Sequence, residues 1–150
     1  MFGRKKKDEK VALGNLIDGV NLPQNTSVQV KMNTNEVMIS GNNQEFLISF
    51  EKLVNVDLKS DVEMEQIIEQ SLPGMVIGAA AFGVIGAMIG GRVKTKEKKK
   101  VSHFLIINFQ SDELKTIVID ASKDWYNAAG LVDLFRKFNN VQTAPVRQVL

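Results

Sequence analysis

The sequence predicts an α+β fold that is mainly antiparallel β, with one amphipathic helix near its C-terminal end. Two observations lead to this prediction. Several short segments alternate apolar and polar residues and are separated by turn-forming residues, as in antiparallel strands. A later segment, Lys123–Asn139, repeats its apolar residues at helical spacing instead. A third feature, the apolar stretch Leu72–Gly91, fits neither pattern and indicates an insertion between strands.

The 150 residues are enough for one domain, and 44% hydrophobic with 24% charged residues allows a buried core. We expect a charged, mobile tail over residues 1–10, a folded domain over 11–140 with an insertion over 61–100, and a C-terminal tail over 141–150. The absence of cysteine excludes disulfides and thiolate metal sites. Because this fits a reducing compartment and no secretory signal is evident, we expect a cytoplasmic protein, with a peripheral position at the inner face of the cell membrane as an option.

Four consecutive strands are predicted in the first part of the chain. They are Ser27–Met32, Glu36–Ser40, Glu45–Phe50 and Leu53–Lys59. The links between them are short, and Gly41-Asn42-Asn43 consists of residues that tolerate positive φ, as a hairpin turn requires. The four strands are therefore expected to form an antiparallel meander. The preceding segment, Leu13–Pro23, mixes apolar residues with turn formers and is interpreted as a partly buried lead-in without regular structure.

A second pair of strands and two helices are predicted further along the chain. The strands are Val101–Phe109, which is apolar on both faces, and Leu114–Asp120. A short amphipathic helix is expected over Asp61–Gln70. The final helix has Ser122 or Asp124 as its N-cap. Its broad apolar face, which we expect in the core, comprises Trp125, Ala128, Leu131, Val132, Phe135 and Phe138.

The stretch Leu72–Gly91 carries no charge, and small residues recur in it at helical spacing, which lets helix backbones approach closely. One spanning helix of this length would place the flanking segments on opposite sides of a bilayer, yet those segments are predicted to share one sheet. We therefore expect a helical hairpin that bends near Phe82-Gly83 and enters one leaflet or packs on another subunit. The alternative is a buried glycine-rich loop or helix pair within the domain. The residues of the expected hairpin surface are Gly74, Gly78, Ala79, Phe82, Gly83, Gly86, Ala87, Gly90 and Gly91.

A cluster of basic residues follows this stretch and forms an expected basic surface. It consists of Arg92, Lys94, Lys96, Lys98, Lys99 and Lys100. A lysine near an anionic membrane contributes about 1 kcal/mol of attraction, so an anionic membrane surface is an expected partner, with Arg4–Lys7 as a second basic group. Nucleic acid would also attract lysine, but no aromatic residues interleave the cluster and no recognition helix is evident. A solvated loop that keeps the neighbouring stretch in solution is the remaining alternative.

The strand series followed by one helix resembles the bacterial pleckstrin-homology-like (PH-like) fold over residues 13–139. In that fold two bent antiparallel sheets form a partly open barrel, and the last helix plugs one end. The chain also resembles small bacterial proteins in which this fold carries a glycine-zipper insert of the pattern Gly-x-x-x-x-Gly-x-x-Gly-Ala-x-x-Gly-Gly, here Gly78–Gly91. The fold usually has seven strands and six are predicted, so either Leu13–Leu22 or Arg92–Lys96 supplies another. The resemblance implies binding to proteins, lipids or further copies, without an enzymatic activity.

Catalytic and cofactor chemistry is poorly represented in the sequence. With one histidine, His103, and no cysteine, zinc sites and Cys–His nucleophiles are excluded in practice, and His103 is expected to be a packed or edge residue. Gly78 and Gly83 have the spacing of a phosphate loop, but Val84-Ile85 follows where lysine and a hydroxyl residue are required. We expect no enzymatic activity and no cofactor.

Three hypotheses for function remain open. In the first, a PH-like body is held at a membrane surface by the hairpin and the basic residues. In the second, the protein is a soluble homo-oligomer whose hairpins pack on each other and hide apolar surface from water. In the third, it is an adaptor or inhibitor that binds another protein through a sheet edge or the mouth of the barrel.

Overall fold

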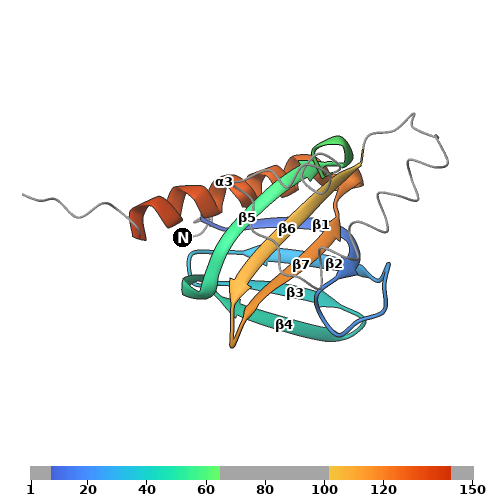
Figure 1. Cartoon of the computed structure of the whole chain (residues 1–150), viewed down its shortest axis with the longest axis horizontal. Coiled ribbons are helices and arrows are strands. Elements are labelled where there is room, and N and C mark those ends of the chain that lie inside the picture. The colour runs from blue at the N-terminus through green and yellow to red at the C-terminus, as the bar shows by residue number, and fades with distance from the viewer. Residues whose placement is uncertain (1–7, 65–101, 143–150) are drawn as a thin grey trace, which may run out of the picture.

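The structure, a computed structural model, describes residues 8–64 and 102–142. These residues form one seven-stranded antiparallel sheet and a C-terminal helix (Figure 1), so the α+β, mainly antiparallel class is confirmed. A helical turn over 61–64 follows the fifth strand. The elements, in chain order, are β1 (Lys10–Asp18), β2 (Ser27–Met32), β3 (Glu36–Gly41), β4 (Gln44–Ser49), the 3₁₀ turn η1 (Phe50–Lys52), β5 (Leu53–Ser60), β6 (His103–Gln110), β7 (Leu114–Asp120), the 3₁₀ turn η2 (Ser122–Asp124) and α3 (Trp125–Gln142).

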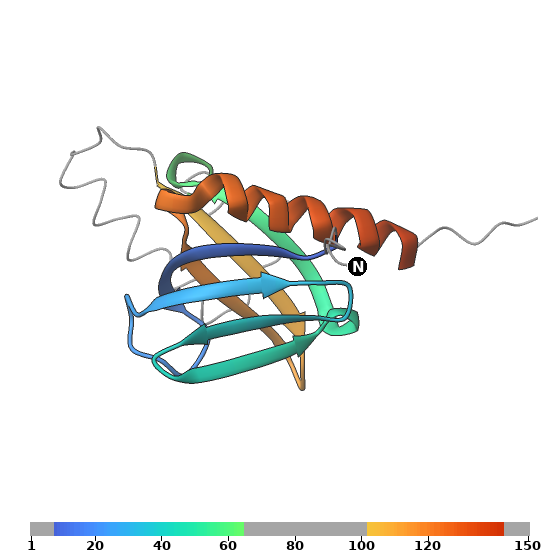
Figure 2. The same cartoon turned by 180° about the vertical axis from the view of Figure 1, so that it is seen from behind.

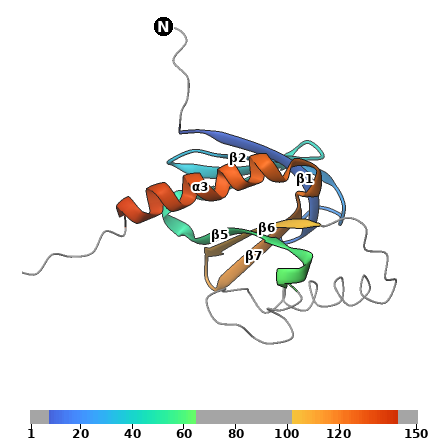
Figure 3. The same ribbon diagram turned by 90° about the horizontal axis from the view of Figure 1, so that it is seen from above.

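The strand order in the sheet is β4-β3-β2-β1-β7-β6-β5, and all neighbouring strands are antiparallel. The sheet bends, so that β1–β4 and β5–β7 run in different directions and form two layers (Figures 1 and 2). Viewed from above, α3 lies between these layers, where it contacts β1 and β5 (Figure 3). The core fills the space that the two layers and α3 enclose.

Five of the six predicted strands match the structure to within one residue, because alternation and turn chemistry agree there. The β3–β4 hairpin turns at Asn42 and Asn43, whose φ angles of 51° and 61° lie in the left-handed region that asparagine tolerates. The β2–β3 turn is held by Asn33, whose Oδ1 accepts hydrogen bonds from the backbone N–H groups of Asn35 (2.7 Å) and Glu36 (3.0 Å). The sixth, β6, begins two residues later than predicted, at His103.

The interpretation of Leu13–Pro23 as an irregular lead-in is wrong, because most of its first half belongs to β1, which pairs with both β2 and β7. β1 is the missing strand. Its alternation is broken in two ways. A bulge between Leu16 and Asp18 shifts the register. At Gly14, a Cβ would lie 2.5 Å from Ile119 Cγ2 and 2.7 Å from the carbonyl oxygen of Asp120, so glycine permits the close approach of β7.

The predicted four-strand meander is wrong in its last strand. β5 does not pair with β4; it lies at the opposite end of the sheet and pairs with β6. The chain changes layers at η1, where Phe50 is buried and its ring lies 5.8 Å from that of Phe135 in α3. The backbone N–H of Phe50 also donates to the carbonyl oxygen of Asn35, at 2.9 Å. Short links in the sequence therefore conceal a crossing between layers.

Candidate interaction surface

All residues of the expected hairpin and of the expected basic surface lie within the segment 65–101, which is outside the described residues. The expected hairpin residues are Gly74, Gly78, Ala79, Phe82, Gly83, Gly86, Ala87, Gly90 and Gly91, and the basic ones are Arg92, Lys94, Lys96, Lys98, Lys99 and Lys100. The candidate surface is therefore built from the described residues on either side of this segment.

The two ends of the segment are attached to neighbouring strands. Ser60, at the end of β5, lies opposite His103, at the start of β6. One residue further out, the backbone N–H of Asp61 donates to the carbonyl oxygen of Ser102, at 3.1 Å. We call residues 60–61 and 102–103 the junction. The expectation that the sequences before and after the segment share one sheet is confirmed, and the chain leaves and returns at one place.

A reciprocal pair of hydrogen bonds starts the helical turn that follows the junction. The backbone N–H of Ser60 donates to Glu63 Oε1 (2.8 Å), and the backbone N–H of Glu63 donates to Ser60 Oγ (3.2 Å). This is the Ser-x-x-Glu capping box, in which two N–H groups at a helix start are satisfied at once. The predicted helix Asp61–Gln70 is helical over 61–64, and its remainder lies outside the described residues.

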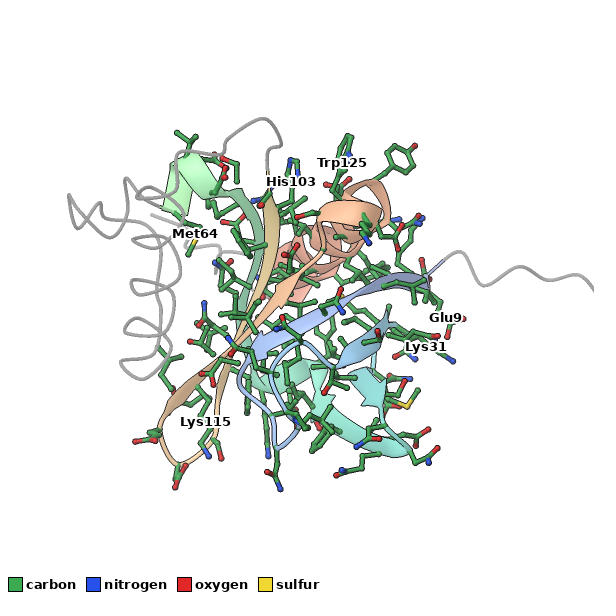
Figure 4. The ribbon with its side chains drawn as sticks, turned by 90° about the vertical axis from the view of Figure 1, so that its right-hand side faces the viewer. Glu9, Lys31, Met64, His103, Lys115 and Trp125 are labelled. Carbon is green, nitrogen blue, oxygen red and sulfur yellow. The ribbon has the colours of Figure 1, made fainter. Side chains whose placement is uncertain are left out.

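Three side chains form an aromatic cluster beside the junction. His103 stacks on Trp125 with ring centroids 5.5 Å apart, and Trp125 meets Tyr126 edge-on at 6.1 Å (Figure 4). Trp125 is 48% exposed and Tyr126 is 76% exposed. The expectation that Trp125 is a core residue is wrong, because it is the first residue of α3 and the core contacts of the helix begin at Ala128. His103 is packed, as expected.

Hydrogen bonds from β6 and β1 hold η2, and with it the start of α3, in place. Ser122 Oγ accepts from the backbone N–H of His103 (3.0 Å) and donates to Asp120 Oδ1 (2.5 Å). Asp124 Oδ2 accepts from the backbone N–H of Leu13 in β1, at 2.8 Å. The sequence marked Ser122 and Asp124 only as candidate helix caps, and their long-range partners carried no local signal. The aromatic cluster therefore rests on a fixed base.

One polar atom of the cluster has no hydrogen-bond partner within the described part of the chain. His103 Nδ1 is buried and has no hydrogen-bond partner among residues 8–64 and 102–142. A buried polar atom in this state costs about 1–3 kcal/mol.

A groove of about 700 Å³ lies next to η2, between β1, β2 and the end of β7. Its lining includes the exposed side chain of Leu13 and the carboxylates of Asp120 and Asp124. Both carboxylates are already engaged by the hydrogen bonds that fix η2. Within the described part of the chain, no group of three or more His, Cys, Asp or Glu residues could hold a metal ion.

No protein-family model matches the chain, and the search of curated proteins finds no match. Of the helices that the structure describes in residues 8–64 and 102–142, none is long and apolar enough to cross a membrane.

Proposed function

We propose that the protein is a non-enzymatic interaction module with a PH-like body, which associates with a membrane surface, with further copies of itself, or with both, through the glycine-rich segment. The observation that carries this proposal is the junction. The segment leaves and returns at Ser60 and His103, beside the exposed rings of Trp125 and Tyr126. One end of the body thus carries both the apolar insertion and an exposed aromatic cluster.

The strand arrangement supports the PH-like part of the proposal. Two antiparallel layers, β1–β4 and β5–β7, continue into each other at β1 and β7, and the C-terminal helix lies across the opening between them (Figure 3). Seven strands and a final helix are what the resemblance implies. PH-like domains bind proteins, lipids or themselves, which agrees with a surface suited to binding.

Two features favour an anionic membrane as the first partner. Tryptophan and tyrosine combine an apolar ring with a polar tip and concentrate where a membrane meets water. The basic residues Arg92–Lys100 come directly after the apolar stretch, where they would meet lipid headgroups. In this arrangement the junction faces the membrane, and the protein remains a peripheral cytoplasmic one.

The test is co-flotation of the full-length chain with liposomes that contain anionic lipid. We expect flotation that weakens when Lys94, Lys96 and Lys98 are changed together to Gln, and that weakens when Trp125 is changed to Ala. Controls are Lys52→Gln with Lys115→Gln, away from the junction, and Leu47→Ala, another exposed apolar residue, on β4. Absence of flotation with anionic liposomes would refute the membrane part.

A soluble homo-oligomeric adaptor is the second candidate, and the open ends of the sheet favour it. β4 and β5 each have one neighbour in the sheet, and they expose Leu47 (60%) and Val54 (42%). Strand edges of this kind can pair with another chain. Light scattering without detergent should then give a mass above that of one chain. Gly86→Leu should reduce this mass, because Gly86 belongs to the expected hairpin surface. Ala80→Leu should not reduce it, because Ala80 does not belong to that surface.

A further inference from the structure

β6 and β7 are buried on both faces. Their core-facing side chains belong to the cluster that the two layers enclose, as Leu105 and Ile107 do. Their opposite side chains are just as buried but belong to no part of that cluster. We call this second surface the outer face; it consists of Phe104, Ile106, Asn108, Thr116 and Val118, together with Ile17 of the neighbouring β1.

The outer face is continuous and dry. Ile106 lies opposite Val118 in the β6–β7 register, and Asn108 lies opposite Thr116. Phe104, Ile106 and Val118 are each 0% exposed. The Thr116 hydroxyl donates to Asn108 Oδ1, so the two buried polar side chains of this face bond to each other. Polar side chains that are buried away from water are generally hydrogen-bonded in this way.

The strands that pair with β6 and β7 do not cover the outer face, because they lie beside them within the same sheet. β6 packs extensively with β5 and β7, β7 packs with β6 and β1, and all of these are neighbours within the sheet. α3 contacts β1 and β5 from the other side. Met64, in the helical turn over 61–64, is also fully buried outside the core cluster, and the segments that continue beyond the described residues, 1–7, 65–101 and 143–150, are the candidates for the cover.

Position and composition select one of these three segments. Residues 65–101 begin directly after Met64, which is 0% exposed, and end three residues before Phe104 on the outer face itself. This segment contains the apolar stretch Leu72–Gly91. Residues 1–7 are mostly basic, and α3 carries the chain away from the junction before residue 143 (Figure 1).

We propose that the outer face of β6 and β7 is a docking surface for the glycine-rich residues 72–91 of the same chain. Large side chains on the strands, such as Phe104 and Ile106, meet small ones on the segment, so the two backbones can approach closely. The inference is independent of membrane binding, since a docked helical hairpin keeps a second face for lipid or for another copy. It therefore survives if the liposome experiment fails.

Thiol labelling tests the docking, because the chain has no cysteine of its own. Val118→Cys reports on the outer face, Ile117→Cys on the core and Leu47→Cys on an open surface. In the full-length protein we expect Val118→Cys to react with a maleimide roughly 100-fold more slowly than Leu47→Cys, since reaction requires local opening. When a Gly/Ser linker replaces residues 72–91, Val118→Cys should react as Leu47→Cys does, while Ile117→Cys stays protected.

Two results of this experiment would overturn the proposal. One is fast labelling of Val118→Cys in the full-length protein. The other is continued protection of Val118→Cys in the linker variant, because the cover would then be another part of the chain. Loss of protection at Ile117→Cys would show that the linker variant is unfolded. In that case a cross-link in the intact chain tests the docking instead.

For that cross-link, Gln110→Cys carries a benzophenone at the exposed end of the outer face. Light-induced cross-links are mapped by mass spectrometry in a mixture of ¹⁴N- and ¹⁵N-labelled protein. We expect products that join position 110 to a peptide within residues 65–101 of the same isotope. Mixed-isotope products would assign the outer face to a second copy, and products outside residues 65–101 would assign it to another segment; either result overturns the proposal.

Discussion

The two layers of the sheet are buried in different ways. In β2 and β3, buried and less buried residues alternate, so one face packs on the core and the other meets solvent. In β6, five consecutive residues from Phe104 to Asn108 are buried, and in β7 the same holds for four residues from Thr116 to Ile119. β2 and β3 of the first layer are covered on one side, and β6 and β7 of the second layer on both.

This difference is already visible in the sequence. Val28, Val30 and Met32 alternate with polar residues, whereas Phe104-Leu105-Ile106-Ile107 is an unbroken apolar run. Unbroken runs are typical of strands with packing on both faces, and they are rare in antiparallel sheets whose outer face is solvated. The run therefore predicts packing on both faces of β6.

The most disruptive change should be truncation on the outer face. Phe104→Ala should lower the free energy of unfolding by about 3–5 kcal/mol, the usual effect of removing a fully buried aromatic ring. Urea unfolding measures it. Leu47→Ala on the exposed side of β4 should stay within about 0.5 kcal/mol of the unaltered protein. Equal effects at the two positions would remove the distinction between the layers.

A smaller effect is expected at the seam between the layers, in β1. Gly14→Ala should destabilise by about 1–3 kcal/mol, because the added Cβ collides with Ile119 and with the backbone of β7. Gly130→Ala in α3 is the matched control: its Cβ would lie 3.6 Å from Lys10 Cδ, an ordinary contact. That change should stabilise by up to about 1 kcal/mol through helix propensity. Thermal unfolding measures the change in stability of both variants. A change in the same direction for both would contradict this account.

The buried polar pair of the outer face should show coupling. Thr116→Val removes the donor to Asn108 and should cost about 1–3 kcal/mol, since a buried acceptor loses a partner. Adding Asn108→Leu to Thr116→Val should cost less than the sum of the two single changes. A double-mutant cycle in urea measures the coupling, and strict additivity would show that the hydrogen bond contributes nothing.

The smallest effect is expected in the one-sided layer, at the β3–β4 turn. Asn43→Ala should cost about 1 kcal/mol, because alanine resists the left-handed conformation at this position. Asn43→Gly should be nearly neutral, since glycine adopts positive φ without a steric penalty. Chemical denaturation distinguishes the two, and a neutral alanine variant would show that the turn does not require this conformation.

Much of the fold could be predicted where local chemistry and tertiary structure agree. β2 has its predicted bounds because its alternating residues face one core, and asparagines at Asn42-Asn43 suit the turn that joins β3 to β4. Leu13–Leu22 was one of two places expected for an additional strand, and β1 lies there, but its residues do not alternate because Gly14 and the bulge after Leu16 serve its pairing with β7, a partner far away in the sequence. The pairing of β5 with β6 was missed for the same reason.

The candidate surface was predictable in part only. The shared sheet on either side of the segment followed from the strand pattern on its two flanks, and the Ser60–His103 pair confirms it. The exposure of Trp125 did not follow, because an apolar residue at helical spacing carries no information on where the helix leaves the core. The roles of Ser122 and Asp124 depend on contacts with His103 and Leu13, which local sequence cannot specify.

The hydrogen bond between Asp61 and Ser102 has a consequence for how the body tolerates change. The entropic cost of closing a loop between two paired strand ends rises slowly as the loop grows, by about 0.6 kcal/mol for each doubling of its length. β5 and β6 can then keep their register whether the connection is short or long. The free-energy penalty for a different insert would then depend little on its length.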